Sequence, residues 1–269
     1  MDKQSRKPII ALALCAGIVA GGAIAQDVPQ QGLRMTFEDT FDQLSVSNRC
    51  GTGATWFNRT PWNGDFGQAA FSGSTNNNSF STDNGILTIT LRKNAQGKWT
   101  SGLLSSLCSD GSGFAQQYGY FEMRAQFPTG EGVWPAFWLI GAERLSPESE
   151  VTAEIDIVEH YGALPQFYSS KWHIWHRDGS GQHETDYQRR PVESGSLSEG
   201  FHTYGVRVDA EQTTFYFNGE PHWSVTTPSA HHQPMMVLAN LGLGGGWPVG
   251  DTANNAEMKI DYIRVYALE

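Results

Sequence analysis

The chain has 269 residues, of which 30 are glycine, 12% are aromatic and only 17% are charged. This length suits one all-β domain, and the composition excludes an intrinsically disordered chain. The formal net charge of −10 argues against nucleic acid or an anionic membrane as a partner, because both would repel the chain.

The first 25 residues have the pattern of a secretory signal peptide. Basic residues precede an apolar stretch of small residues (9–25), which ends in Ala-Ile-Ala, a typical cleavage site. The alternative is an N-terminal membrane anchor, but the stretch is short for a bilayer span. We therefore expect residues 1–25 to be removed, and residues 26–269 to form one domain, secreted or periplasmic, with no membrane partner.

Cys50 and Cys108 are the cysteines that remain after residue 25. In an exported protein they can form one disulfide, and the alternative is a pair of unpaired, buried thiols. A bridge that closes a loop of this length would stabilise the fold by roughly 4 kcal/mol in the chain-entropy model. No cluster of cysteine and histidine has the spacing of a zinc site.

Short segments of alternating apolar and polar residues follow along the chain, and no stretch has a persuasive helical period. The predicted strands lie within residues 85–93, 118–127, 132–141, 202–225 and 258–268. Asn-Gly dipeptides at 84–85 and 218–219 are typical of tight hairpin turns. Many short strands with turns between them predict an all-β sandwich or jelly roll.

The stretch AEIDIVEHYG (153–162) places three carboxylates among β-branched residues. Side chains alternate faces along a strand, so Glu154 and Asp156 share a face, and Glu159, five residues from Glu154, should point the other way. One extra residue near Ile157 and Val158, forming a β-bulge, would bring all three acids to one face. The stretch is therefore either an acidic surface strand or part of an active site.

Carboxylates on one face repel one another, and glycoside hydrolysis is a reaction that uses such a cluster. A retaining enzyme needs one carboxylate as nucleophile and one protonated carboxyl group as the acid. Three tryptophans, Trp134, Trp138 and Trp247, can act as stacking platforms for sugar rings. The alternative for each of them is packing in the core.

Several stretches of the sequence match those of one protein family. They are TSGLLSS (100–106), YGYFEMRAQFPTGEGVWPAFWL (118–139), EIDIVE (154–159), FHTYGVRV (201–208), FYFNGE (215–220), NLGLGGGWPVG (240–250) and MKIDYIRVY (258–266). With them the chain resembles glycoside hydrolase family 16, the retaining endo-β-glycanases. The resemblance implies a β-jelly-roll sandwich of two curved antiparallel sheets with a concave substrate cleft, and a single catalytic domain over residues 26–269.

The resemblance also assigns roles. It implies Glu154 as the nucleophile, Asp156 as the assisting acid and Glu159 as the general acid/base, with no cofactor required for catalysis. The spacing of these acids resembles the bulged branch of the family, which includes laminarinases, agarases and carrageenases. The extra residue is thus implied to be a bulge.

Further positions match the family. Trp134, Trp138 and Trp247 correspond to positions in or near the cleft, and His173 and Asn240 resemble cleft residues that contact substrate. A packed or surface histidine is the alternative for His173, since His176 is a second candidate in the same stretch.

Many family members bind one structural calcium ion away from the cleft. Asp261 fits the side-chain ligand of that site, and the region of Glu38 can supply backbone oxygen. We expect a calcium site there and a monomeric protein.

The expected substrate is a polysaccharide, most simply a β-1,3-glucan or a mixed β-1,3/1,4-glucan. A basic loop, residues 171–190, offers an alternative, the depolymerisation of an acidic bacterial exopolysaccharide whose charged groups the loop would contact. The basic residues there are Lys171, His173, His176, Arg177, Arg189 and Arg190. They can also form a solvated surface without a binding role.

Two other classes remain to be weighed. A non-catalytic carbohydrate-binding jelly roll would share the tryptophans, but it needs no nucleophile and acid. A jelly-roll polysaccharide lyase would rely on a tyrosine or histidine base instead, and its products would carry an unsaturated end.

Overall fold

The computed structural model describes residues 32–71 and 79–269. The predicted signal peptide, residues 1–25, and nearly all of the polar loop at 74–79 lie outside these residues. No helix in the described ranges has the length and apolarity to cross a bilayer.

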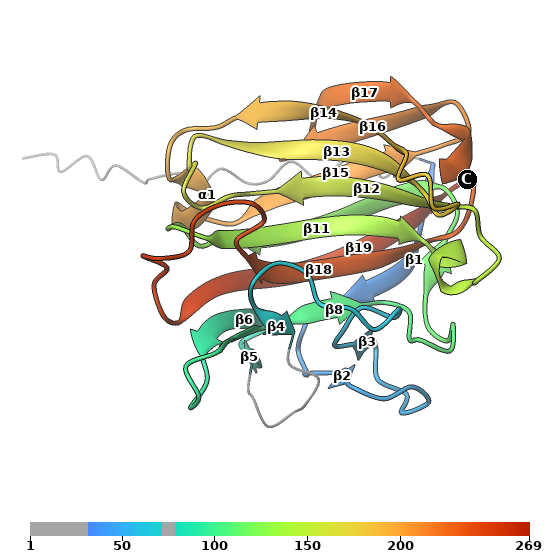
Figure 1. The fold of residues 1–269 in the computed structure, drawn as a ribbon. Helices are drawn as coiled ribbons and strands as arrows, with labels where there is room; N and C mark the ends of the chain where they lie inside the picture. The colour runs from blue at the N-terminus through green and yellow to red at the C-terminus, as the bar shows by residue number, and fades with distance from the viewer. Residues whose placement is uncertain (1–31, 72–78) are drawn as a thin grey trace, which may run out of the picture.

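The described chain folds into two stacked β-sheets, which are mainly antiparallel (Figure 1). Across the first sheet, the strands are β17 (Glu220–Thr226), β16 (Gln212–Phe217), β15 (His202–Val208), β10 (Gly119–Gln126), β19 (Ala256–Leu268), β6 (Ile86–Lys93), β7 (Trp99–Ser101) and β4 (Ala70–Phe71), with β1 (Leu33–Asp39) beside β19 and β5 (Phe80–Asp83) beside β6. This sheet forms the back of the sandwich.

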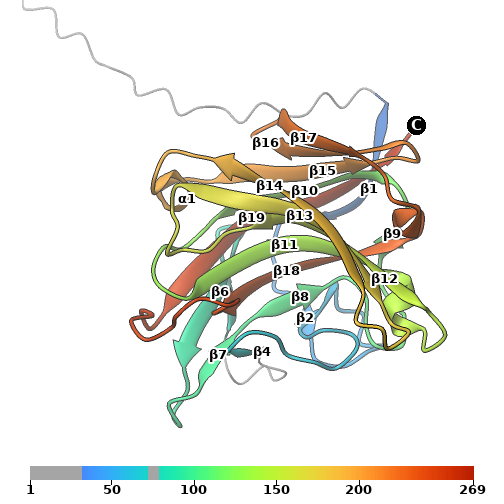
Figure 2. The same cartoon turned by 45° about the horizontal axis from the view of Figure 1, so that its top comes forward.

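The second sheet forms the front and carries the acidic stretch. Across it, the strands are β14 (His183–Pro191), β13 (Phe167–His176), β12 (Val151–Glu159), β11 (Val133–Gly141), β18 (Met235–Leu243), β8 (Leu103–Ser105), β3 (Trp56–Phe57) and β2 (Val46–Ser47), with β9 (Ala115–Gln116) beside β18. Figure 2 shows β14, β13, β12, β11 and β18 side by side and curved. The predicted all-β jelly-roll sandwich is confirmed.

Helices contribute little to the described chain. They are α1 (Ser196–Glu199) and two short 3-10 segments, η2 (Ala142–Leu145) and η3 (Ser229–His231). The predicted turns lie where expected, between β5 and β6 and between β16 and β17. Asn84 and Asn218 adopt the left-handed region, with φ of 50° and 51°, and each is followed by a glycine in the same region. This geometry lets a two-residue turn follow the twist of the strands that it joins.

The core lies between the sheets and follows from strand alternation. In β6, Leu87, Ile89 and Leu91 are fully buried, and in β11 of the other sheet Phe137 and Leu139 pack into the same cluster. The alternate residues of β11 face the opposite side of the front sheet. The second sheet therefore has one face in the core and one face free for a site.

Residues 171–190 are not a loop, and that expectation was wrong. They form most of β13 and β14, an antiparallel hairpin at the edge of the front sheet. Almost every residue of β14 is exposed, so both of its faces are polar. A strand that is polar on both faces lacks the alternation by which strands are recognised.

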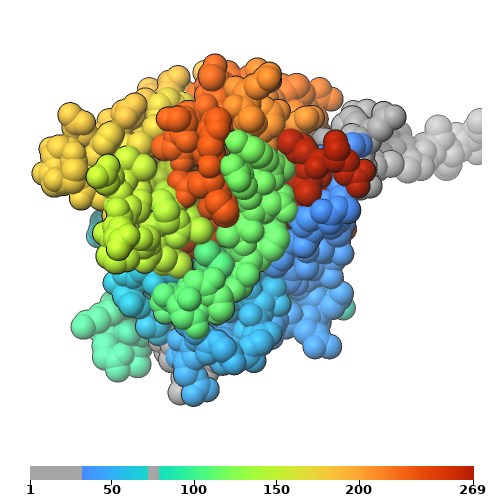
Figure 3. Space-filling view, turned by 90° about the vertical axis from the view of Figure 1, so that its right-hand side faces the viewer, coloured from blue at the N-terminus to red at the C-terminus, as the bar shows by residue number. Residues whose placement is uncertain are grey.

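The ends of the described chain meet in the back sheet. Strand β1 pairs antiparallel with the C-terminal strand β19, from Leu33 opposite Leu268 to Asp39 opposite Ile263. Figure 3 shows the C-terminal atoms, in red, beside those of β1, in blue. The first and last strands are therefore tied together.

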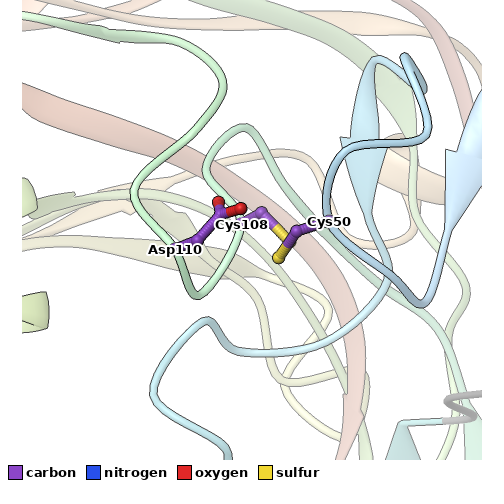
Figure 4. Close-up of side chains that lie close together, drawn as sticks. All are labelled: Cys50, Cys108 and Asp110. Carbon is purple, nitrogen blue, oxygen red and sulfur yellow. A yellow bond between two sulfur atoms is a disulfide. The ribbon is translucent and has the colours of Figure 1, made fainter.

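The structure joins Cys50 to Cys108, with Cα atoms 5.6 Å apart (Figure 4). The bond links the segment after β2 to the turn after β8, a separation of 58 residues. It fixes a long surface connection to the edge of the front sheet.

Loss of this bond should lower stability. Because the loop that it closes is long, replacing both cysteines by alanine should lower the free energy of unfolding by roughly 4 kcal/mol. Chemical unfolding of the variant and of the wild type under oxidising conditions measures the difference. The wild type under reducing conditions should match the variant, and equal stability in all three samples would contradict the prediction.

Candidate active site

A β-bulge in β12 brings the three acids to one face of the front sheet. Against β11, Trp138 lies opposite Asp156 and Phe137 lies opposite Val158, so that Ile157 has no partner of its own. The register against β13 shifts over the same residues. Ile157 and Val158 both pack into the core between the sheets. Because two consecutive residues face the core, the alternation of faces resumes one residue later. Glu159 therefore points to the same side of the sheet as Glu154 and Asp156.

Glu154 and Asp156 each receive a contact from strand β13. The indole Nε1 of Trp175 donates to Glu154 Oε2 at 3.1 Å. His173 Nε2 lies 3.0 Å from Asp156 Oδ2, and the carboxylates of Glu154 and Asp156 and the ring of His173 have ligand atoms within 4.8 Å of one another. The side chains converge, as a concave sheet requires.

Glu159 lies between an aromatic wall and a cation. The indole Nε1 of Trp134 donates to Glu159 Oε1 at 2.9 Å, and the hydroxyl of Tyr161 donates to the same oxygen at 3.3 Å. The ammonium group of Lys171 forms an ion pair with the other oxygen. Three residues, from two strands and one loop, therefore hold this carboxyl group in place.

Burial is the main influence on the acidity of the cluster. It raises the pKa of Glu154 well above its usual value, and the charges on Asp156 and Glu159 add to the shift. Burial and Asp156 also raise the pKa of Glu159, whereas Lys171 and Trp134 oppose that shift. Because three close carboxyl groups cannot all ionise easily, the cluster keeps a proton to a higher pH than isolated carboxyl groups do.

Lys171 should set the pH range of activity. Its positive charge favours the ionised form of Glu159, so Lys171→Met should raise the pKa of Glu159. A general acid works only while it is protonated, so the basic limb of kcat/KM should move to higher pH. A pH–rate profile on a soluble polysaccharide substrate measures the shift. Lys171→Arg keeps the charge and should keep the limb in place, whereas an unmoved limb in Lys171→Met would contradict the prediction.

A cavity of about 260 Å³ lies directly over the acids. The carboxylates of Glu154, Asp156 and Glu159 all line it, together with Trp134 and Trp138 of β11. Trp62 and Phe66, from the connection between β3 and β4, form its other wall. The indoles of Trp62 and Trp138 meet edge to face at 6.2 Å. An aromatic cavity with carboxylates on its floor is suited to a sugar ring.

Asn240 lies on the floor of this cavity, on β18. The indole Nε1 of Trp138 donates to Asn240 Oδ1 at 2.8 Å, while the buried Nδ2 has no partner in the described chain. A buried donor without a partner is costly, so a bound hydroxyl group is its natural acceptor. Trp134, Trp138 and Asn240 thus all line this cavity, and their contact with substrate stays a prediction.

Trp247 lies farther along the cleft, in the connection between β18 and β19. It is 38% exposed, and its ring lies 5.8 Å from that of Tyr161. Together with Lys171, Tyr187 and Arg189, these two rings line a second cavity of about 290 Å³. This cavity adjoins Glu159 and extends the cleft towards β14.

A third cavity, of about 330 Å³, lies on the side of Glu154. Trp62, Trp175, Arg144 and Arg177 line it. Burial lowers the pKa of Arg144, and the like charge of Arg177 lowers it further. The cleft therefore continues on both sides of the acids, with a cationic group in each extension.

The predicted cluster of basic residues is divided by strand alternation. Lys171, His173 and Arg189 face the cleft. His176 points to the other side of β13 and pairs with Glu184. The guanidinium of Arg190 lies 5.8 Å from the ring of Phe217 of the back sheet. Of the two histidine candidates, His173 contacts Asp156, whereas His176 contacts Glu184 on the other face.

The surroundings of Asp261 do not fit a calcium ion. Its carboxylate forms an ion pair with Arg124 of the neighbouring strand, and Glu38 is paired with Arg264 at 2.8 Å. No group of three metal-binding side chains includes Asp261 in the described residues. An ion at this position would have to displace a guanidinium group, and the calcium site stays a prediction.

Several site residues were not expected from the sequence. Trp175 and the contact of Lys171 with Glu159 follow from period two once β13 is known as a strand. Tyr161 lies two residues beyond the end of β12, in a loop. Trp62 and Phe66 come from an irregular connection, and no local pattern identifies them. Their position depends on how that connection folds over the sheet.

Buried paired carboxyl groups on the concave face of a jelly roll, between tryptophans, define the site of a glycoside hydrolase. The model of glycosyl hydrolases family 16 matches residues 67–264. The chain therefore belongs to glycosyl hydrolases family 16.

Curated relatives include two endo-1,3-1,4-beta-glycanases of Rhizobium meliloti, ExsH and EglC. They are 35% and 33% identical to this chain over 88% of its length. The chain spans about half of each relative, 52% of its length.

Solved structures support the fold. The laminarinase catalytic domain from Thermotoga maritima superposes with a TM-score of 0.70 at 22% identity, covering 88% of this chain and 99% of that domain. At this level of identity, the similarity establishes the jelly roll.

Proposed function

We propose that the protein is an endo-acting, retaining β-glycanase that hydrolyses β-1,3-glucan or mixed β-1,3/1,4-glucan. The observation that carries the proposal is the position of Glu154, Asp156 and Glu159 on one face of a bulged strand, beneath an aromatic cavity. The two endo-1,3-1,4-beta-glycanases among the relatives support the choice of polymer.

In this mechanism Glu159 donates its proton to the leaving oxygen while Glu154 attacks the anomeric carbon. Burial and the negative charge of Asp156 raise the pKa of Glu159, which favours the protonated form that the acid step needs. After the first product leaves, Glu159 acts as a base towards water, which releases the sugar from Glu154. Asp156, held by His173, lies between the two and adjusts their charge. No step requires a cofactor.

A product profile tests the proposal. The protein would be incubated with laminarin, mixed-linkage β-glucan, agarose and carrageenan, and mass spectrometry would identify the fragments. We expect saturated fragments from the glucans, released with retained anomeric configuration in proton NMR. Fragments with an unsaturated end would indicate a lyase, and binding without cleavage would indicate a carbohydrate-binding protein.

We also propose that the protein is exported, with residues 1–25 as its signal. Polymers of this kind lie outside the cell, and a disulfide persists in an oxidising compartment. Mass spectrometry of the protein from culture medium and periplasm tests this, with a mature N-terminus at Gln26 as the expected result. An uncleaved protein retained in the cytoplasm would contradict it.

A second candidate substrate is a polysaccharide with carboxylated side groups. The observation that favours it is the pair Arg144 and Arg177 near Glu154, together with Arg189 near Glu159. Within residues 32–71 and 79–269, none of these three arginines forms an ion pair with a carboxylate. Cationic groups that repel each other in a cavity favour an anionic ligand.

Matched substrates separate the two candidates. An acidic bacterial exopolysaccharide would be compared with the same polymer after its carboxyl groups are reduced to alcohols. If the arginines bind the carboxylates of the polymer, reduction of these carboxylates should lower kcat/KM. Arg177→Gln should then lower kcat/KM for the acidic polymer and leave that for the reduced polymer unchanged. Equal rates on both polymers would leave the neutral glucan as the substrate.

A further inference from the structure

Three aromatic rings from two strands lie together beside the acids. Trp175 and His183 are direct partners across β13 and β14. Their rings are parallel within 2°, with centroids 3.7 Å apart. His173 lies beside both, with its ring 5.1 Å from Trp175 and 4.9 Å from His183. Each ring of β13 contacts a different acid, while His183 contacts neither.

Hydrogen bonds extend this cluster to Asp156. His173 Nδ1 lies 2.7 Å from His183 Nε2, and His173 Nε2 lies 3.0 Å from Asp156 Oδ2. An ionised carboxylate can only accept, so His173 donates through Nε2. In a neutral imidazole the other nitrogen is then an acceptor, and His183 Nε2 must be the donor to it. Asp156 therefore places the proton of His173 on Nε2, and a donor N–H of His183 supports the same tautomer from the other side of the ring.

The position of His183 is not required by the core. It is exposed, and among the described strands β14 is an edge strand that pairs with β13 alone. Partial burial lowers the pKa of His183, and this favours the neutral ring that can form the hydrogen bond. What the exposed imidazole of His183 does at this place is to contact His173 and Trp175.

We propose that His183 is a positioning residue, which orients the nucleophile Glu154 through Trp175 and the assisting acid Asp156 through His173. It would act on two acids from outside their strand, without touching substrate. This proposal rests on the catalytic roles given above. A misplaced catalytic group lowers the rate of the chemical step more than it lowers substrate binding.

Nitrogen NMR of the free, histidine-labelled protein tests the proposal without an activity assay. In the wild type we expect His173 to be protonated on Nε2, with an accepting Nδ1. His183→Phe keeps a ring on Trp175 but removes the donor, so the His173 signals should move towards a mixture of tautomers. His183→Gln keeps an N–H donor and should preserve the wild-type signals. Unchanged signals in His183→Phe would overturn the proposal.

Kinetics provide the second readout, on a polymer that the wild type hydrolyses. His183→Ala loses both contacts, and kcat should fall about tenfold while KM changes less than about twofold. His183→Phe and His183→Gln should each recover part of the loss. A rise in KM at unchanged kcat would show a sugar contact instead and would overturn the positioning role. Failure of the wild type to hydrolyse any polymer would refute the proposed function, while the NMR result would still stand.

Glu184→Ala is the matched control. Glu184 follows His183 in β14, but its side chain points to the other face, where it contacts His176 at 2.9 Å. Its replacement should leave kcat and the His173 signals unchanged. Thermal unfolding of all variants shows whether each retains the fold, and a kcat loss of the same size in Glu184→Ala would overturn the specific role of His183.

Discussion

Glu154→Gln should reduce kcat by at least about 10⁴-fold, because an amide cannot form the covalent bond to the anomeric carbon. The fold should be kept. Burial disfavours the charged form of Glu154. A neutral side chain of the same shape therefore should not lower the stability of the fold. Polymer hydrolysis measured by reducing ends, with thermal unfolding in parallel, checks both parts.

Each part of this prediction has a result that would contradict it. Activity close to that of the wild type would show that Glu154 is not the nucleophile. A variant that unfolds at a much lower temperature would show that the residue stabilises the fold, and its lost activity would then carry no information. Glu257→Gln is a suitable control, since Glu257 is exposed on β19 of the back sheet.

Glu159→Ala should have the second largest effect, and its size should depend on the leaving group. Without the acid, kcat on a polysaccharide should fall about 10²- to 10⁴-fold. An aryl glycoside with a strongly acidic phenol needs no protonation, so formation of the glycosyl-enzyme should stay fast and its hydrolysis should become slow. A burst of released phenol measures this change.

Added azide gives the control for this variant. Azide attacks without a base, so it should restore turnover of the aryl glycoside by Glu159→Ala and yield a glycosyl azide. Glu154→Gln should show no such recovery with retained configuration. Equal losses on the polymer and on the aryl glycoside, without azide rescue, would contradict the acid/base role of Glu159.

Much of the fold follows from local patterns. The strands within 85–93, 118–127, 132–141 and 258–268 alternate regularly, and each lies within one or two residues of its prediction. Strand β14 was missed because both of its faces are exposed, so its sequence does not alternate. Pairing with β13 stabilises it, and pairing is a tertiary interaction.

The residues of the site also divide into those that local patterns predict and those that they do not. The acids of β12 and the tryptophans of β11 lie on regular or singly bulged strands, where spacing decides the face. Trp62 and Phe66 lie in an irregular connection, and Arg144 lies in a 3-10 segment. Side chains from such segments reach the cleft through the path of the backbone, which their sequence alone does not specify.

The bulge at Ile157 and Val158 has a consequence for how the distance between the acids of β12 can vary. Removal of either residue would leave plain alternation, with every acid still on the cleft face and one fewer residue in the core. Ile157 and Val158 thus act as a spacer between Asp156 and Glu159. The spacer can change by one residue without moving Glu159 to the other face of the sheet. The distance along β12 between Asp156 and Glu159 can therefore change by one residue while the sandwich behind the strand keeps its order.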